Sequence, residues 1–476
     1  MRKIGVFMVC MAVFGFLYAG SARAVDVKFS GTFDVTGLYD ARPTMDSSDA
    51  SSALFFQELN LRAVFEVAPG LSLTTKIVAL TKIWGDTDWN GTRGDSFGRP
   101  VGGGSAEIGP PSARVQASRA RENIEIQEAY LTYNAGKVGT FRVGYVPHDT
   151  QWGTVWGTSE RPCAIIQWGK PVGDFSFGLK YIKANEGSNT YKWQDNTSNN
   201  SDSDVYVGNV MYKKDFLFTG FKWAYLNNRA GRSATSPDWI TLPRESTTTG
   251  HLLTPFVIMT FGPVKIEAEV EHFTGKRKFH GGTGNDLSMR TLAAFLNGEY
   301  TQGPFGVGAT LAYASGNDGA SGVMGQLPDT SFTSWGGLDY NPGLIMWNED
   351  RNEWRGGLGA SHLGSSGPIA NNVRSGVANA RMVSLYGNYK PTESWNLKLV
   401  WLYAKAAERA WNGGGRFVSK DYGHEVDFIA TYKITNNLKY MVGAGYLFAG
   451  DYFKGSDKNN KVSDDYLFTN KLTLTF

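Results

Sequence analysis

The sequence has little of what most soluble or helical membrane proteins are built from. Charged residues make up 19% of the 476 residues, below the roughly 25% that is usual for soluble chains. No apolar run of about 18 residues follows the N-terminal segment, which argues against transmembrane helices. The two cysteines, Cys10 and Cys163, provide neither a disulfide framework nor a thiolate metal cluster.

A surplus of one charge sign is also missing. Lys and Arg number 47, and Asp and Glu number 44. Arg2, Lys3 and Arg23 account for the difference, and they lie in an N-terminal segment without acidic residues. The rest of the chain is therefore formally neutral, and a general basic surface for nucleic acid is not expected.

Residues 1–24 have the pattern of a secretory signal peptide. Arg2 and Lys3 precede an apolar stretch over 4–18, and Ala22 and Ala24 frame a small-x-small cleavage signal. A membrane anchor is the alternative, but the apolar stretch is short and no stop-transfer charges follow it. We expect export and removal after Ala24.

The remaining chain alternates apolar and polar residues with a period of two. Successive side chains of a strand point to opposite faces, so this pattern predicts strands with one apolar and one polar face. We expect about 18 strands, at residues 26–40, 54–67, 71–84, 122–134, 139–148, 162–170, 174–184, 203–213, 216–227, 251–261, 264–275, 287–301, 305–315, 377–390, 394–406, 422–434, 438–449 and 463–476.

The connections between these segments alternate between short turns and long polar loops. Short connections such as 68–70 and 435–437 contrast with long ones such as 85–121 and 316–376. Soluble sandwiches also alternate along their strands, but this regular order of turns and loops places all turns at one rim. It predicts an all-β fold over 25–476, a single transmembrane antiparallel β-barrel with short periplasmic turns and long extracellular loops.

Parts of the sequence resemble alginate-export-type outer-membrane porins. The resemblance rests on residues 425–428, 432–438 and 443–451, and on the paired segments 129–133 and 139–144. It implies an 18-stranded barrel with a charged lumen that passes an anionic polysaccharide. The polar faces here carry charges of both signs, however, whereas an alginate channel is expected to be strongly basic.

The polar faces predict a charged lining for a water-filled lumen, since barrels of 16–18 strands leave an aqueous channel. The alternative is that each charge is only solvated or paired with its neighbour. The run Glu267, Glu269 and Glu271 is the best candidate for a stripe that attracts cations. The predicted lining residues are Lys28, Arg62, Lys76, Arg142, Lys265, Glu267, Glu269, Glu271, Lys398, Glu425 and Asp427.

The connection at 316–376 is the longest, and loops of more than about 15 residues are usually functional or disordered. It contains several large apolar side chains, among them Trp335, Tyr340, Trp347 and Trp354. We expect the loop to fold into the barrel mouth and narrow it. Packing against other loops outside the pore is the alternative.

Few motifs indicate a metal or a reaction. Asp86, Asp88 and Asn90 reproduce the first half of a calcium-binding loop, but Phe97 stands where the bidentate Glu belongs. No other cofactor is expected. The histidines lack metal-ligand spacing, and His362 lies in a glycine-rich loop rather than on a rigid element, so no enzyme is predicted.

These features together predict a porin in the outer membrane of a Gram-negative bacterium. It would pass small polar solutes or anionic oligosaccharides by diffusion. The alternative is a barrel that sheathes a partner, such as a multihaem electron-transfer cytochrome. The expected partners are outer-membrane lipid, lipopolysaccharide and the solute, with a second copy or a periplasmic protein as further candidates.

Overall fold

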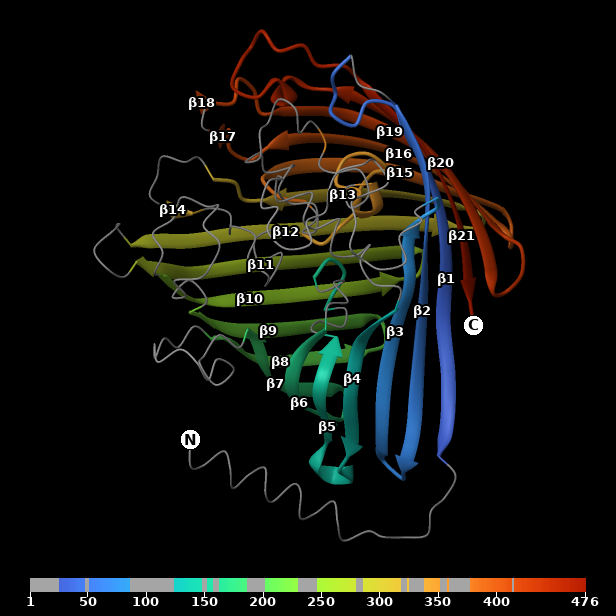
Figure 1. Ribbon diagram of the computed structural model, residues 1–476, viewed down its shortest axis with the longest axis vertical. Helices are drawn as coiled ribbons and strands as arrows, with labels where there is room; N and C mark the ends of the chain where they lie inside the picture. The colour runs from blue at the N-terminus through green and yellow to red at the C-terminus, as the bar shows by residue number, and fades with distance from the viewer. Residues whose placement is uncertain are drawn as a thin grey trace.

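The computed structural model describes residues 25–47, 51–85, 124–147, 152–156, 162–185, 202–229, 246–279, 286–317, 323–324, 338–351, 358, 377–412 and 415–476. These residues form a closed antiparallel barrel of 18 strands. Figure 1 shows the strands side by side around the barrel, with β1 next to both β2 and β21. The predicted signal peptide lies outside the described residues.

Each predicted segment is a strand of this barrel, so the fold prediction is confirmed. The strands are β1 (Asp26–Asp40), β2 (Ser52–Ala68), β3 (Leu71–Ile83), β4 (Ile124–Asn134), β5 (Thr140–Pro147), β6 (Pro162–Val172), β7 (Phe175–Asn185), β8 (Ser203–Lys214), β9 (Leu217–Asn228), β10 (Ser246–Phe261), β11 (Val264–Phe279), β12 (Leu287–Gln302), β13 (Phe305–Ala314), β15 (Ala380–Thr392), β16 (Trp395–Ala406), β19 (Asp421–Lys433), β20 (Leu438–Ala449) and β21 (Asp465–Thr475).

The chain also contains a few short elements that are not among the 18 barrel strands. β14 (Val323–Met324) pairs in parallel with β12, and β17 (Trp411–Asn412) pairs with β18 (Gly415–Arg416). Two one-turn 3-10 helices, η1 (Gly136–Val138) and η4 (Asp451–Lys454), lie between strands. No helix in the described part of the chain is long and apolar enough to cross a membrane, a finding that concerns helical spans alone.

The largest boundary differences lie at the long-loop ends of β10 and β11. β10 begins at Ser246 rather than at 251, and β11 continues to Phe279 rather than ending at 275. The added residues are mostly polar on both faces, so hydropathy alternation does not mark them. Their backbones nevertheless pair in register, from Ser246 opposite Phe279 onward.

The first and last strands close the barrel. β1 pairs antiparallel with β21 from Thr32 opposite Thr475 to Asp40 opposite Leu467. Gly31 and Phe476 extend the seam by exchanging two backbone hydrogen bonds of 2.7 and 3.0 Å. Gly31 also needs its small size, since a Cβ there would lie 2.8 Å from the Phe476 ring. Closure leaves no strand edge with unpaired backbone groups in hydrocarbon.

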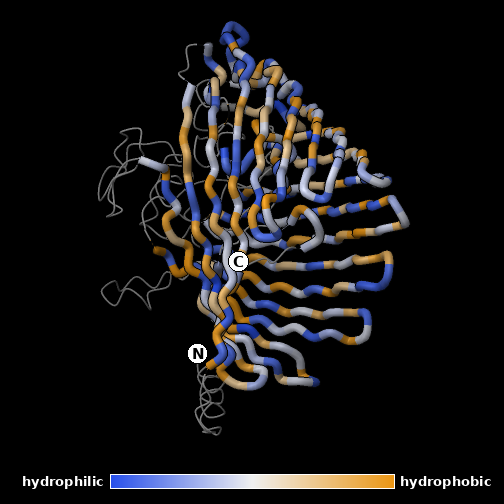
Figure 2. The backbone as a smooth tube through the Cα atoms, turned by 90° about the vertical axis from the view of Figure 1, so that its right-hand side faces the viewer, coloured by the Kyte–Doolittle hydropathy of each residue, from blue (hydrophilic) through white to orange (hydrophobic). Residues whose placement is uncertain are grey.

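The two faces of the barrel wall differ in chemistry. Large apolar side chains such as Leu385 (49%) and Leu399 (57%) are exposed on the outside, whereas Ser384, next to Leu385 in the sequence, points inward and is buried. Figure 2 shows hydrophobic and hydrophilic residues alternating along the strands. The exposed face fits lipid, which covers the outside of a transmembrane barrel.

Aromatic side chains ring the apolar surface at two levels. At the short-turn rim, Trp395 lies 4.7 Å from Tyr432 and Phe305 lies 4.8 Å from Tyr389 between ring centroids. Nearer the long loops, His424 stacks on Tyr403 at 4.5 Å. Such paired girdles mark the two membrane interfaces of outer-membrane barrels.

The outer belt predicts where a charge is costly. Leu399 lies between the two girdles, so L399R should lower the free energy of unfolding by about 2–4 kcal/mol. The matched change V138R, at the exposed Val138 of the short-turn rim, should cost at most about 1 kcal/mol. Reversible denaturant unfolding in lipid vesicles measures both. Equal costs for the two variants would contradict the assignment of the lipid-facing belt.

Candidate channel lumen

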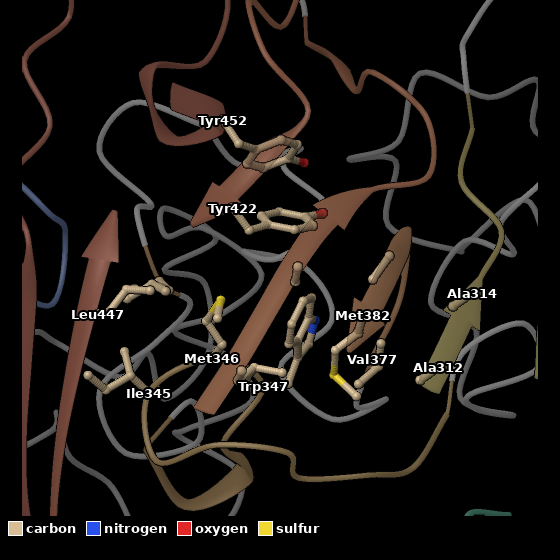
Figure 3. Close-up of a cluster of buried hydrophobic side chains, with 14 of the residues drawn as sticks. Ala312, Ala314, Ile345, Met346, Trp347, Val377, Met382, Tyr422, Leu447 and Tyr452 are labelled. Carbon is tan, nitrogen blue, oxygen red and sulfur yellow. The ribbon is translucent and has the colours of Figure 1, made fainter. Parts of the chain in front are cut away.

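Two loop segments, 152–156 and 338–351, lie against the inner wall of the barrel. In the first, Trp152 and Trp156 pair with each other, and the Trp152 Nε1–H donates to the Thr254 carbonyl on β10 at 2.9 Å. In the second, Trp347 is buried with its ring centroid 5.4 Å from that of Tyr422 on β19. Figure 3 shows Ile345 beside Leu447, and Met346 and Trp347 among side chains of the wall.

Two carboxylates of β19 hold the second segment. Their neighbour Val426 is exposed on the outer face, whereas Glu425 and Asp427 are fully buried on the inner face. Glu425 accepts hydrogen bonds from the backbone N–H groups of Ile345 at 2.7 Å and Met346 at 2.8 Å. Asp427 accepts one from Leu344 at 3.2 Å. The carboxylates thus satisfy backbone donors that a buried turn would otherwise leave without acceptors.

Carboxylates of β11 hold the first segment in the same way. Glu269, which is 1% exposed, accepts hydrogen bonds from the backbone N–H groups of Thr154 at 2.7 Å and Val155 at 3.0 Å. Glu267 accepts the Thr154 hydroxyl at 3.1 Å and forms an ion pair of 2.9 Å with Lys265. Gly153 has a positive φ of 64° and no room for a Cβ, which would lie 2.8 Å from the Glu269 carboxyl carbon.

The two segments also touch each other. The backbone N–H of Asp339 donates to the Val155 carbonyl at 3.0 Å. The neighbouring Tyr340 packs edge-on against Phe295 of β12, with ring centroids 5.2 Å apart. Segments from two loops that are far apart in the sequence therefore form one continuous layer on the inner wall.

A buried ion cluster ties the second segment to the seam of the barrel. The side chains of Arg351, Asp40 of β1 and Asp465 of β21 are all 0% exposed. The Arg351 guanidinium lies 3.0 Å from Asp40 and 3.5 Å from Asp465, and it also donates to the Pro43 carbonyl at 3.3 Å. The Arg42 backbone N–H donates to Asp465 at 2.8 Å. The cluster thus joins the long loop to both strands that close the barrel.

The predicted basic lining residues differ in exposure. Lys28 and Lys265 keep 67% and 46% of their side chains exposed. Arg62 is 42% exposed, and its Nη2 donates to both carboxylate oxygens of the buried Glu128 at 2.8 and 3.1 Å. Lys398 lies over the Tyr386 ring at 4.9 Å.

The remaining predicted residues have mixed positions. Lys76 and Glu271 are buried, and Arg142 is partly exposed. Tyr340 and Trp347 belong to the segment on the inner wall, whereas Trp335 and Trp354 lie outside the described residues. The predicted calcium ligands Asp86, Asp88 and Asn90 lie outside them too. Within the described residues, no three His, Cys, Asp or Glu side chains gather as metal ligands.

The anchoring groups Trp152, Arg351, Asp40 and Asp465 are not among the residues that the sequence predicted. The two tryptophans in the short stretch 152–156 were a usable signal, because a solvated loop rarely needs two such rings so close together. Arg351 offered no signal, since its partners are more than 100 residues away.

Comparison with known proteins gives the fold a class. No family model matches the sequence, and no curated protein matches it. Two solved structures are similar to it, each with a TM-score of 0.50. In both cases the matched region covers 95% of this chain and 99% of the other chain. One is the outer membrane protein OpdK from Pseudomonas aeruginosa, at 8% identity, and the other is a BenF-like porin from Pseudomonas fluorescens Pf-5, at 10% identity.

The chain therefore has the fold of an outer-membrane porin barrel. At such identities the likeness concerns the fold alone. The resemblance to alginate-export-type porins stays a prediction.

The buried ion cluster predicts a strong effect on stability. R351M leaves Asp40 and Asp465 as uncompensated buried charges, so it should lower the free energy of unfolding by about 3–5 kcal/mol. The matched change K420M removes a partly exposed ion pair with Glu408 and should cost less than about 1 kcal/mol. Denaturant unfolding at neutral pH measures both, and a near-neutral R351M would contradict the anchoring role.

Proposed function

We propose that the protein is an outer-membrane channel through which small polar solutes diffuse. The observation that carries the proposal is the closed barrel of 18 strands, with an apolar exterior and with charged and polar side chains among the apolar groups of its inner face. Barrels of this size are too wide for side chains to fill and leave an aqueous passage. The porin fold of the structural neighbours supports the same conclusion.

The inner layer formed by 152–156 and 338–351 is the proposed constriction. Because Glu269 and Glu425 each accept two backbone hydrogen bonds from it, the layer is fixed to the wall rather than free in the lumen. It reduces the open cross-section on the side of β11 to β19. A sheath for a large partner would need that space empty, so the layer favours a solute channel.

The charges that remain accessible give the proposed lining. Lys28, Arg62 and Lys265 keep a large part of their side chains exposed, whereas Glu269, Glu425 and Asp427 are buried under the two segments. Each of these cations has a carboxylate partner, namely Glu66, Glu128 and Glu267, and Glu66 is itself 42% exposed. The lining that a solute meets therefore carries charges of both signs, which supports small polar solutes, and its exposed cations give anionic oligosaccharides a place to bind.

Conductance tests the channel and the constriction together. In planar bilayers the purified protein should give discrete, ohmic conductance steps. Removal of residues 318–372 should raise the step size severalfold, because the passage loses the 338–351 part of its inner layer. The deletion should be made with D40N and D465N, since Arg351 is lost with the loop, and the full-length D40N/D465N protein is the matched control.

The outcomes separate the alternatives. An unchanged step size after the deletion would contradict the proposal that the segment 338–351 constricts the channel. The absence of any conductance from the folded full-length protein would contradict the channel and favour the sheath that encloses a partner.

A further inference from the structure

A pocket of about 280 Å³ lies at the long-loop rim of the barrel. It is lined by Asn227, Arg229, Thr247, Thr249 and Lys278, from β9, β10 and β11 and the residue that follows β9. The cross-strand register brings them together, because Thr249 lies opposite Asn227 and Thr247 opposite Lys278. Its lining is polar and basic, unlike the apolar surface below it.

The pocket belongs to the outer face of the barrel rather than to the lumen. Asn227 follows the exposed Trp223 and the partly exposed Tyr225 at intervals of two along β9, so all three point the same way. On β10, Thr249 shares its face with the exposed His251. The inward side of these strands is instead formed by buried groups such as Thr248.

The cations of the pocket have no described carboxylate as a partner. The Arg229 side chain donates a weak hydrogen bond of 3.3 Å to the Asn227 side-chain oxygen. Among the described residues, no carboxylate lies within ion-pair distance of Arg229 or Lys278. Two acids are nearby, but Asp202 pairs with Lys183 at 2.8 Å and Asp286 accepts the Phe279 backbone N–H at 3.3 Å. The exposed Lys276 adds a further positive charge next to the pocket.

The surface below the pocket is arranged in layers. Next to the pocket, His251 packs between Trp223 and Tyr225, at 5.9 and 5.1 Å between ring centroids, and accepts a hydrogen bond from the Trp223 indole at 3.2 Å. Further from the rim lies the exposed apolar surface, for example Phe221. The order of apolar belt, aromatic layer and basic pocket matches the order of acyl chains, interface and charged head group in a lipid leaflet.

A second pair of cations lies further round the same rim. Arg381 of β15 is directly opposite Lys405 of β16, and both side chains are exposed on the outer face. Like charges in directly opposed positions destabilise a sheet. Lys405 also lies opposite Asp421 of β19 across a bulge. The rim therefore carries a second outward-facing pair of cations.

We propose that the Arg229–Lys278 pocket binds a phosphate group of an outer-leaflet glycolipid while the acyl chains of that lipid lie on the apolar belt. The planar guanidinium of Arg229 suits two phosphate oxygens at once. Lys278 supplies a second charge, and the Asn227 amide and the Thr249 hydroxyl supply neutral donors. This site lies outside the lumen, and it can bind lipid whether or not the barrel conducts.

Native mass spectrometry of the full chain with defined lipids tests the proposal. The probes are diphosphoryl lipid A, the same lipid with its phosphates removed, and inorganic phosphate. The wild-type protein should retain diphosphoryl lipid A and release the dephosphorylated form. R229Q/K278Q should bind diphosphoryl lipid A about tenfold more weakly or worse, as expected when charge-assisted contacts are lost.

The matched control is K390Q/K439Q, which removes two exposed lysines at the short-turn rim and should bind like the wild type. R229K/K278R keeps both charges and should retain most of the binding. Heat-modifiable migration on gels shows that each variant is folded. If R229Q/K278Q does not fold, the comparison of the two lipid A forms on the wild type decides the matter.

Three results would overturn the proposal. One is equal retention of the two lipid A forms by the wild type. Another is undiminished binding of diphosphoryl lipid A by folded R229Q/K278Q. The third is displacement of the lipid by millimolar inorganic phosphate, which would assign the pocket to a free anion instead.

Discussion

Backbone hydrogen bonding in a medium without water is the constraint on which the rest of the structure depends. Hydrocarbon offers no partner to an N–H or C=O group, so a sheet in lipid must close. The pairing of β1 with β21 provides that closure, and it is continued by the two hydrogen bonds between Gly31 and Phe476. Closure in turn sorts the side chains, with one alternate set facing lipid and the other facing the interior. The apolar belt, the aromatic girdles and the inner carboxylates all follow from this sorting.

The same constraint acts inside the barrel on the two segments that line its wall. Their turns bury backbone N–H groups that no strand can satisfy. Glu425 and Glu269 accept these groups, each from two successive residues. These acidic side chains, which the sequence predicts as the lining of an open pore, thus hold the two segments in position on the wall. The charge that a passing solute meets depends on which charges the segments leave accessible.

The sequence predicts the barrel well because the strand signal is local. Leu472 and Leu474 of β21, for example, alternate with Lys471 and Thr473, and short turns join many successive strands. The sequence also predicts that Glu425 points inward. Val426 and Phe428 are apolar and belong to the lipid-facing set, so Glu425 and Asp427 belong to the opposite face. Its partners Ile345 and Met346 are about 80 residues away, and alternation carries no information over that distance. Arg351 and Asp40 meet only because the barrel closes, and shear and loop path decide that contact.

Amide hydrogen exchange across the seam tests closure most directly. In lipid bilayers, the amides of β1 and β21 that pair between Thr32 and Asp40 should exchange as slowly as those between the central strands β11 and β12. Local exchange reports the opening free energy of each region, so a sealed seam and a central pair should be protected alike. Rapid exchange confined to β1 and β21, with slow exchange elsewhere, would show an open sheet edge and contradict the account.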